Sequence, residues 1–406
     1  MKILIVEDEK VTRKLLRNRL EKWGYEVTSA ADGLEAWELF QREAFPMVIS
    51  DWMMPGLDGL ELVRRIRAFD RPGYVYTILL TARDRREDIL AGMAAGADDF
   101  ITKPFDQEEL AARIKVGARI TRLEQELEKR NRELEKANRR MKRDLEAAAR
   151  IQRSLLPARL PHCPGVEFAW KYEPCEELAG DTLNLFMLDE SHVGLYLLDV
   201  SGHGVPAALL SVNLSRILTP DPGQSDLLKE ACPEGADGYC LIKPAEVANR
   251  LNQRFPLDER TGQYFTFQYG QLEITSRTLT FVSAGHPPMI HLKADGGVET
   301  LLVRSLPIGF KSEEPDLYRE RELKLEAGDR LYFYSDGILE AAAPESREMF
   351  GIDRLKETLD RARGQSLAAG LETVCRELER WSGSPRQADD VSLLALAVTE
   401  YGNAQS

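Results

Sequence analysis

The first 120 residues alternate between short apolar runs and longer segments with helical periodicity. The runs cover residues 2–6, 47–50, 76–80 and 99–102, and each has the length and aliphatic composition of a buried strand. Helical patterns lie between them, and the first places Leu15, Leu16 and Leu20 on one face. Strands that alternate with helices form an open parallel sheet, so residues 1–120 are expected to fold as a doubly wound, flavodoxin-like α/β domain.

Residues 121–156 have a different pattern. They contain no Gly or Pro, and 18 of these 36 residues are charged. Apolar side chains recur every seven residues, at Ile120, Leu127, Leu134, Met141, Ala148 and Leu155. A second seam contains Leu145, Asn131 and Asn138, together with Glu124 and Gln152, which weaken it. This spacing predicts a helical linker that pairs as a parallel two-stranded coiled coil. A solvated single helix that acts as a spacer is the alternative.

The remaining residues, 157–406, combine clustered strand patterns with helical ones. Strands are expected near residues 193–200, 265–272, 278–284, 330–334 and 392–398, and helices near 207–218, 244–255, 354–363 and 367–381. Strands in clusters with helices between them favour an α+β sandwich. Residues 219–240 are rich in Pro, Gly and Asp, so we expect an irregular insertion there.

Composition restricts the partners and the compartment. The net charge of -13 argues against nucleic acid as a partner. No apolar run is long enough for a transmembrane helix and the N-terminus has no signal-peptide pattern, so we expect no membrane contact and a cytoplasmic location. The cysteines are scattered, without a CxxC motif, and are expected to be reduced thiols; they are Cys163, Cys175, Cys232, Cys240 and Cys375.

Five polar side chains follow successive strands of the predicted parallel sheet. They are Glu7, Asp8, Asp51, Thr81 and Lys103. Functional groups of such sheets gather beyond the carboxyl ends of the strands, so these side chains are expected to form one site. Three carboxylates suit Mg²⁺, and a lysine with a hydroxyl suits the oxygens of a phosphoryl group. A single polar residue at a strand end is usually only a loop residue, but five polar residues at the ends of successive strands favour a site.

The same segment resembles the receiver domain of two-component response regulators. The matching stretches are ILIVED, ISDWMMPGLDG, LLTA and GADDFITKPF. The resemblance implies that Asp51 accepts a phosphoryl group from a histidine kinase, and that Mg²⁺ is held by Glu7, Asp8, Asp51 and the carbonyl of Met53. It also implies that Thr81 and Lys103 contact the phosphoryl group and that Phe100 reorients on activation. An ordinary core aromatic at position 100 fits the sequence equally well.

Four aspartates of the C-terminal half lie at the edges of strand-like runs. Asp181, Asp199, Asp336 and Asp389 are far apart in the chain, and most have glycine close by. Aspartates of this kind can converge on two Mg²⁺ or Mn²⁺ ions, which prefer oxygen ligands. Two such ions can activate water and hold a phosphate ester for in-line attack. The sequence has no GxSxG motif that would supply a serine nucleophile instead.

Residues 148–400 resemble the metal-dependent (protein phosphatase 2C-like) serine/threonine phosphatases, and most closely the branch of stage II sporulation and sigma-regulator phosphatases. The matching stretches are IQRSLLP, ELAGD, LYLLDVSGHGVPAALLS, SAGHPP, LPIG, GDRLYFYSDGILEA and DDVSLLAL. The resemblance implies that Asp181, Asp199, Asp336, Asp389 and the Val200 carbonyl bind two Mn²⁺ or Mg²⁺ ions, with Asp390 as a less defined neighbour.

The sequence departs from the family at one position. Members often read GGDxxD, whereas this chain has Asn184 in place of the second acid. The two histidines of the motifs, His203 and His286, are expected to be structural, although His203 could also donate a proton to a leaving alkoxide.

These features favour a response regulator whose output is a phosphatase that acts on a phosphorylated anti-sigma-factor antagonist. The alternative is an inactive adaptor that binds a sigma factor and presents it to a protease. The complete set of aspartates favours the enzyme, because an adaptor does not need them. The direction in which Asp51 phosphorylation changes activity stays open.

Overall fold

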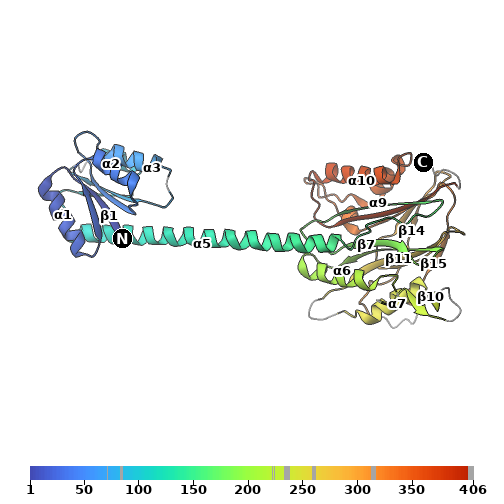
Figure 1. Ribbon diagram of the computed structural model, residues 1–406. Helices are drawn as coiled ribbons and strands as arrows, with labels where there is room; N and C mark the ends of the chain where they lie inside the picture. Colours follow the sequence, from blue (N-terminus) through green and yellow to red (C-terminus); the bar gives the residue numbers. More distant parts are fainter. Residues whose placement is uncertain are drawn as a thin grey trace. The chain divides into compact units, whose positions relative to one another are not determined.

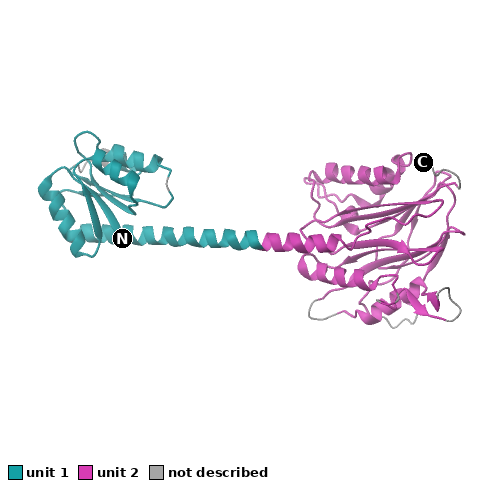
Figure 2. Ribbon diagram, in the orientation of Figure 1, with its two compact units in different colours: residues 1–140 teal, residues 141–406 magenta. Residues whose placement is uncertain are grey.

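The computed structural model describes residues 1–70, 72–82, 86–221, 223, 225–232, 238–257, 262–311 and 317–400. The chain forms two compact units, residues 1–140 and 141–406 (Figure 2). One helix, α5 (Gln107–Arg153), contributes residues to both units.

The first unit contains a parallel sheet flanked by helices (Figure 1). The sheet has five strands in the order β2-β1-β3-β4-β5. Its strands are β1 (Lys2–Val6), β2 (Glu26–Ala30), β3 (Met47–Asp51), β4 (Tyr76–Thr81) and β5 (Asp99–Thr102). Its helices are α1 (Lys10–Lys22), α2 (Gly33–Arg42), α3 (Gly59–Ala68), α4 (Arg86–Ala94) and the start of α5. The predicted doubly wound α/β fold is confirmed. Strand β2 was not predicted, because this edge strand is mostly half-exposed and its sequence, EVTSA, has no continuous apolar run.

Helices cover both faces of this sheet because successive strand residues point to opposite sides. On β1, Ile3 and Ile5 join a core with α1 and the first turns of α5. Leu4 and Val6, on the other face, join a core with α2 and α3. Strands buried on both faces explain the continuous apolar runs in the sequence.

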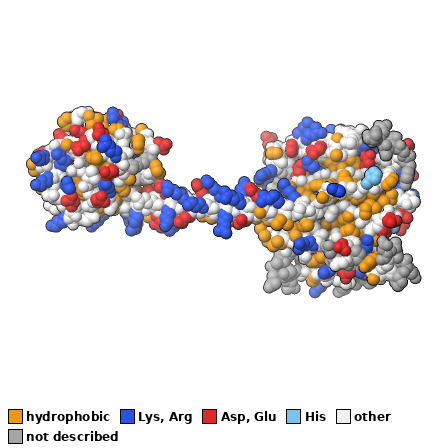
Figure 3. Space-filling view, viewed as in Figure 1, with side chains coloured by type: hydrophobic (Ala, Val, Ile, Leu, Met, Phe, Trp, Pro, Cys, Tyr) orange, Lys and Arg blue, Asp and Glu red, His pale blue; other side chains and the backbone are white. Residues whose placement is uncertain are grey.

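Helix α5 begins before the predicted linker. Its first turns bury Leu110 and Ile114 in the core of the first unit. Farther along, ion pairs four residues apart stabilise the helix, including Arg130–Glu126 at 2.7 Å. Figure 3 shows charged side chains crowded along this middle part of the helix. Leu134, on the predicted seam, is 62% exposed in the single chain, and pairing through the seam stays a prediction.

The second unit contains two five-stranded antiparallel sheets. The first has the order β15-β12-β11-β8-β7 and the second the order β14-β13-β16-β17-β6. The strands of the first sheet are β7 (Thr182–Met187), β8 (His192–Val200), β11 (Phe265–Glu273), β12 (Thr278–Ala284) and β15 (Arg321–Lys324). Those of the second are β6 (Val166–Glu173), β13 (Met289–Leu292), β14 (Val298–Leu301), β16 (Arg330–Tyr334) and β17 (Val391–Val398).

The two sheets pack face to face and each carries helices on its outer face (Figure 1). Helices α6 (Val205–Ile217) and α7 (Pro244–Arg254) cover the first sheet. Helices α9 (Gly351–Arg361) and α10 (Leu367–Ser382) cover the second, and the short α8 (Asp336–Leu339) follows β16. The residues between the sheets are mostly aliphatic, such as Leu195, Leu197 and Leu396. This arrangement confirms the predicted α+β sandwich.

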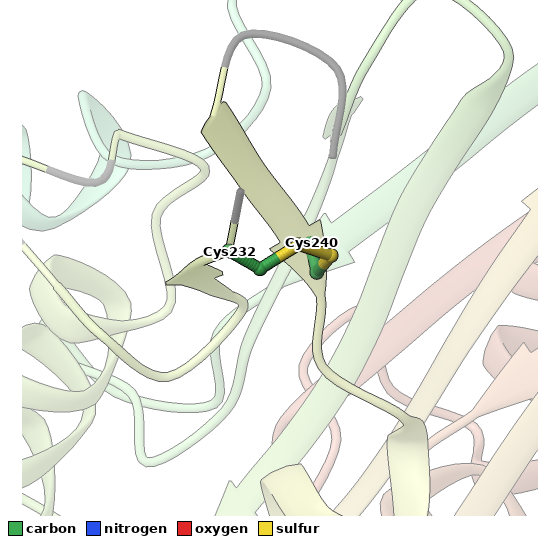
Figure 4. Close-up of a disulfide and its surroundings, with 2 residues drawn as sticks. All are labelled: Cys232 and Cys240. Carbon is green, nitrogen blue, oxygen red and sulfur yellow. A yellow bond between two sulfur atoms is a disulfide. The ribbon is translucent and has the colours of Figure 1, made fainter. Parts of the chain in front are cut away.

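The insertion at residues 219–240 is less irregular than predicted. It contains the short antiparallel pair β9 (Lys229–Ala231) and β10 (Tyr239–Leu241), and Leu227 and Leu228 are buried. The prediction of five reduced thiols is wrong for two of them, because Cys232 and Cys240 form a disulfide across this pair (Figure 4). The strand pairing brings the two residues together, and their spacing in the sequence alone does not indicate it. Residues 222, 224 and 233–237 of the insertion lie outside the described part.

No helix among the described residues has both the length and the apolar character needed to cross a lipid bilayer.

Candidate functional sites

The first site lies at the carboxyl ends of the parallel strands. Glu7 follows β1, Asp51 ends β3 and Thr81 ends β4, and the register pairs Val6 with Ser50 and Asp51 with Leu80. Ligand oxygens of Glu7, Asp8 and Asp51 lie within 4.8 Å of one another. The parallel register therefore brings together three acids that are up to 44 residues apart in the sequence.

Lys103 connects this site to β5. Its Nζ donates hydrogen bonds to Asp51 Oδ2 at 2.6 Å and to Glu7 Oε2 at 2.7 Å. Burial alone would lower the pKa of Lys103, but these two partners outweigh burial and hold the pKa above its ordinary value. Burial raises the pKa of Glu7, and Lys103 acts against this rise. The lysine thus carries the positive charge that keeps two largely buried acids close together.

The other predicted receiver residues lie around this cluster. The Met53 amide is 3.4 Å from Asp51 Oδ1, and the Thr81 carbonyl accepts a 2.7 Å hydrogen bond from the Lys103 amide. Phe100 is half-buried and packs against the small core that contains Trp52 and Leu79. An aromatic in that position can be a core residue or a moving one.

The second site is built from the ends of both sheets of the sandwich. Thr182 pairs with Leu198, so the antiparallel register places Asp181 opposite Asp199 at the end of β7 and β8. In the other sheet, Tyr334 pairs with Leu393, and the Ser335 amide donates to the Ser392 carbonyl at 3.0 Å. Asp336 and Asp389 therefore lie at the same end of β16 and β17.

These acids are close enough to repel one another. Burial, and then the carboxylates of Asp336 and Asp389, raise the pKa of Asp199 to about 7. Burial and Asp389 raise the pKa of Asp336 to about 6. Asp181 is 1% exposed, and burial followed by the charge of Asp199 raises its pKa well above the ordinary value. Its Oδ2 is buried and has no hydrogen-bond partner. Such a set of oxygens fits divalent cations, which would offset the repulsion.

Asp390 acts on the site through the backbone. Its Oδ1 accepts from the Cys175 amide at 2.9 Å, and its Oδ2 accepts from the Gly180 amide at 2.7 Å and the Asp181 amide at 3.4 Å. The Asp390 side chain therefore fixes the loop that carries Asp181. Asp389, by contrast, is exposed, and its carboxylate accepts the Asp390 amide at 2.8 Å.

Two glycines of the motifs permit close contact between backbone segments. A Cβ on Gly337 would lie 2.2 Å from the Asp390 carbonyl oxygen, and one on Gly180 would lie 2.8 Å from the Val200 carbonyl oxygen. Both glycines have ordinary φ angles, so they are needed here for space and not for a left-handed conformation. Gly180 also places the Val200 carbonyl beside the Asp181 loop.

Two residues at this site were not predicted from the sequence. Gln152, in the last turn of α5, donates from Nε2 to the Ala179 carbonyl at 2.7 Å and to Ser211 Oγ at 3.0 Å. Its Oε1 accepts the Ala179 amide at 3.2 Å. Cys175 has a sulfur within 4.8 Å of ligand oxygens of both Asp389 and Asp390. The IQRSLLP stretch contains Gln152, but only the fold shows its partner.

The remaining motif residues lie at the edges of this site. The His203 side chain is 74% exposed, with Nδ1 3.4 Å from Glu176 Oε1. His286 is buried and its Nδ1 is 2.7 Å from Thr266 Oγ1; burial lowers its pKa to about 3, so it is neutral. Asn184 donates to the Leu155 carbonyl at 3.4 Å, close to the end of α5.

Comparisons with known proteins agree with these two folds. The family model "Stage II sporulation protein E (SpoIIE)" matches residues 189–399, and the model "Response regulator receiver domain" matches residues 3–115. The chain belongs to the SpoIIE family and carries an N-terminal response regulator receiver domain in front of a SpoIIE-type, PP2C-like phosphatase domain.

Curated relatives match the receiver part. The uncharacterized transcriptional regulatory protein YkoG of Bacillus subtilis is 45% identical over 117 residues, which cover 29% of this chain and 50% of that protein. The response regulator MprA of Mycobacterium leprae is 44% identical over 124 residues, which cover 30% of this chain and 53% of that protein. The chain thus spans about half the length of the curated relatives it matches.

A solved structure matches the second unit. The SiaA-PP2C domain of Pseudomonas aeruginosa superposes with a TM-score of 0.52 at 22% identity, covering 64% of this chain and 98% of that domain. At this identity the likeness supports the fold alone.

Proposed function

We propose that this chain is a cytoplasmic response regulator in which phosphorylation of Asp51 controls a metal-dependent protein serine/threonine phosphatase. One observation carries the phosphatase proposal. Four aspartates from distant segments lie at one end of the sandwich, where burial and neighbouring carboxylates, including Asp390, raise their pKa values. Structural carboxylates are normally paired with cationic side chains or hydrogen-bond donors, so this arrangement fits bound cations.

Asp181, Asp199, Asp336 and Asp389 would hold two Mn²⁺ or Mg²⁺ ions, with the Val200 carbonyl as a further ligand. Cations bound there would neutralise the charge of a phosphate ester and activate water for attack on phosphorus. The protein's part is to position the ligands. Asp390 fixes the backbone of the Asp181 loop through three amide contacts, and Gly180 and Gly337 let the surrounding strands approach closely.

In the receiver domain, Asp51 would accept the phosphoryl group from a histidine kinase. Glu7, Asp8, Asp51 and the Met53 carbonyl would hold Mg²⁺, which would neutralise the transferred group. The Nζ of Lys103 already lies 2.6 Å from Asp51 Oδ2 and could hold a phosphoryl oxygen from the same position. Thr81, at the end of the neighbouring strand, would bind another oxygen, and Phe100 would follow the change at the site.

The resemblance to sporulation and sigma-regulator phosphatases supports a phosphorylated anti-sigma-factor antagonist as the substrate. We assign residues 1–120 to the receiver, 121–156 to the linker and 157–406 to the phosphatase.

Exposed seam residues such as Leu127 and Leu134 support pairing of two chains in parallel through the linker. Pairing would bury these apolar side chains, which are exposed to water in a single helix.

A phosphatase assay tests this proposal. The full chain should release phosphate from a phosphoserine protein when Mn²⁺ is present, and Asp199→Ala with Asp336→Ala should abolish the release. Glu340→Ala, which removes an exposed acid beside the site, is the matched control. Repeating the assay with beryllium fluoride, which mimics phosphorylated Asp51, measures the control exerted by the receiver. Unchanged turnover in the double variant would refute the proposal, and tight binding of a sigma factor without turnover would favour the adaptor instead.

A further inference from the structure

The disulfide between Cys232 and Cys240 lies in the inserted segment, outside the two sites described above. The register of β9 and β10 pairs Ala231 with Tyr239, and the Cys232 amide donates to the Gly238 carbonyl at 2.9 Å. The Cα atoms of the two cysteines are 5.5 Å apart, within the range that a disulfide requires (Figure 4). The register places Cys240 opposite Glu230, and Cys232 follows Ala231, so the two cysteines are diagonal neighbours on the same face of the strand pair, within reach of each other.

The two cysteines of this pair differ from the other three in their surroundings. Cys163 and Cys375 are buried and have no disulfide partner. Cys175 is half-buried and its amide donates to Asp390; burial and the charge of Asp390 raise the pKa of its thiol to about 12. Cys232 and Cys240 are both partly exposed and have each other as partner. Small thiols and disulfides can reach a pair that is partly exposed, and disulfides that solvent can reach are more labile than fully buried ones.

The insertion is anchored independently of the disulfide. Leu227, Leu228 and Ile242 are buried in the core beneath the first sheet, and the Ile242 amide donates to the Leu228 carbonyl at 3.0 Å. Gln271 on β11 donates to the Ile242 carbonyl at 2.7 Å. These contacts involve residues before Cys232 and after Cys240, so the base of the hairpin stays anchored when the bond is open.

Disulfides in reducing compartments are usually transient, so the cytoplasmic location proposed above makes a permanent disulfide unexpected. We infer that Cys232 and Cys240 form a reversible thiol–disulfide site that exchanges with low-molecular-weight disulfides such as oxidised glutathione. The site needs no metal and does not depend on the proposed phosphatase activity.

The exchange proceeds in two steps. The thiolate of one cysteine attacks a sulfur of glutathione disulfide, which breaks the S–S bond, forms a mixed disulfide and releases one glutathione thiolate. The thiolate of the second cysteine then attacks the protein sulfur of the mixed disulfide and releases the second glutathione. Two protein thiols are oxidised, one small disulfide is reduced to two thiols, and the two protons lost by the cysteines are taken up by the departing glutathiones.

Closing the bond restricts the motion of β9, the strand before Cys232. The same strand is held from its other side, because Glu230 forms a 2.7 Å ion pair with Arg250 on α7. The Cys232 amide hydrogen bond should then open less often. We expect hydrogen exchange at that amide to slow by at least tenfold in the oxidised form.

The test uses the full chain, equilibrated without denaturant in mixtures of reduced and oxidised glutathione. The thiols are then trapped with an alkylating reagent under denaturing conditions and located by mass spectrometry. We expect five alkylated cysteines at the reducing end and three at the oxidising end, with Cys232 and Cys240 protected and the change reversed when the mixture is reversed. Cys375→Ser is the matched control and should lower both counts by one.

Two results would overturn the inference. Labelling of Cys232 and Cys240 at every glutathione ratio would show that the bond does not form, and protection of both at every ratio would show a permanent structural disulfide. Cys232→Ser separates chemistry from misfolding, because Cys232 is only partly buried and the base of the hairpin is anchored without it, so thermal melting under reducing conditions should be unchanged. In this variant Cys240 should carry glutathione as a mixed disulfide under oxidising conditions.

Discussion

The contact between Gln152 and Ala179 gives a strong prediction for the substitution Gln152→Met. Gln152 is buried in the last turn of α5, and its amide forms three hydrogen bonds, two with the Ala179 backbone and one with Ser211. Ala179 lies two residues before Asp181, so the same contact fixes the start of the acidic loop. Methionine preserves the length of the side chain and removes every hydrogen bond.

Each neutral hydrogen bond contributes about 1 kcal/mol net, so the three together contribute about 3 kcal/mol. The variant also leaves the buried Ala179 amide without a partner, which costs about 1–3 kcal/mol, whereas the Ala179 carbonyl still accepts from Ser211 Oγ at 3.5 Å. We therefore expect the second unit to lose at least about 3 kcal/mol of unfolding free energy. The shifted loop should also bind Mn²⁺ less tightly, so phosphate release should require a higher Mn²⁺ concentration.

Urea denaturation and a Mn²⁺ titration of activity measure the two effects. Arg150→Met is the control, because Arg150 is exposed on the same turn and its side chain forms no hydrogen bond or ion pair within the described part of the chain. A Gln152→Met variant that is as stable and as sensitive to Mn²⁺ as the Arg150→Met control would refute the argument that this glutamine fixes the loop.

Three further predictions follow from individual contacts. Gly337→Ala should cost about 1–3 kcal/mol by urea denaturation and remove Mn²⁺-dependent activity, because its Cβ would overlap the carbonyl oxygen of Asp390; wild-type stability would contradict this. Lys103→Ala should destabilise the receiver by about 1–3 kcal/mol, which is less than the loss expected when one partner of a fully buried ion pair is removed. Mg²⁺ can replace the missing positive charge, so in thermal melting it should stabilise this variant more than the wild type. Asp329→Asn should cost about 1–3 kcal/mol at neutral pH, because Asp329 accepts two backbone amides and lies 3.0 Å from His291 Nε2. Burial opposes ionisation of Asp329, but these partners outweigh it and lower its pKa, so the difference from the wild type should be complete above about pH 4 and shrink below it; a difference that grows in acid would contradict the assignment.

The receiver site could be predicted from the sequence because a parallel sheet places the ends of its strands at one edge. Once Glu7, Asp51 and Thr81 were each assigned to a strand end, their proximity followed from topology. The aspartates of the sandwich are different, because antiparallel sheets with long connections do not place strand ends by a comparable rule. Periodicity identified most of their strands, but the proposed grouping of Asp181 with Asp336 depended on the family resemblance.

The residues that were missed have roles that depend on contacts between distant segments. Gln152 was interpreted as a weak seam position because its heptad spacing is regular, whereas its partner lies 27 residues away. The cysteine pair depends on the register of a short hairpin whose strands have three residues each. No local pattern distinguishes such a hairpin from a loop rich in Pro and Gly, so the insertion was expected to be irregular.

The structure also restricts how far a coiled coil could extend along α5. Gln152 occupies one seam position, yet its side chain is buried against Ala179 and Ser211 of the same unit. Leu156, just beyond the helix, is buried in the core between the sheets. A partner helix therefore cannot use the last turn, and pairing would have to end before it.

The start of α5 is not available for pairing either, because Leu110 and Ile114 are buried in the receiver core. The segment available for pairing is the exposed middle, which contains Leu127, Leu134 and the two asparagines. The linker has no Gly or Pro between residues 121 and 156, and its helix ends at the Gln152 contact with Ala179 that fixes the Asp181 loop. This contact gives a physical route by which a change in the helix could reach the acidic site.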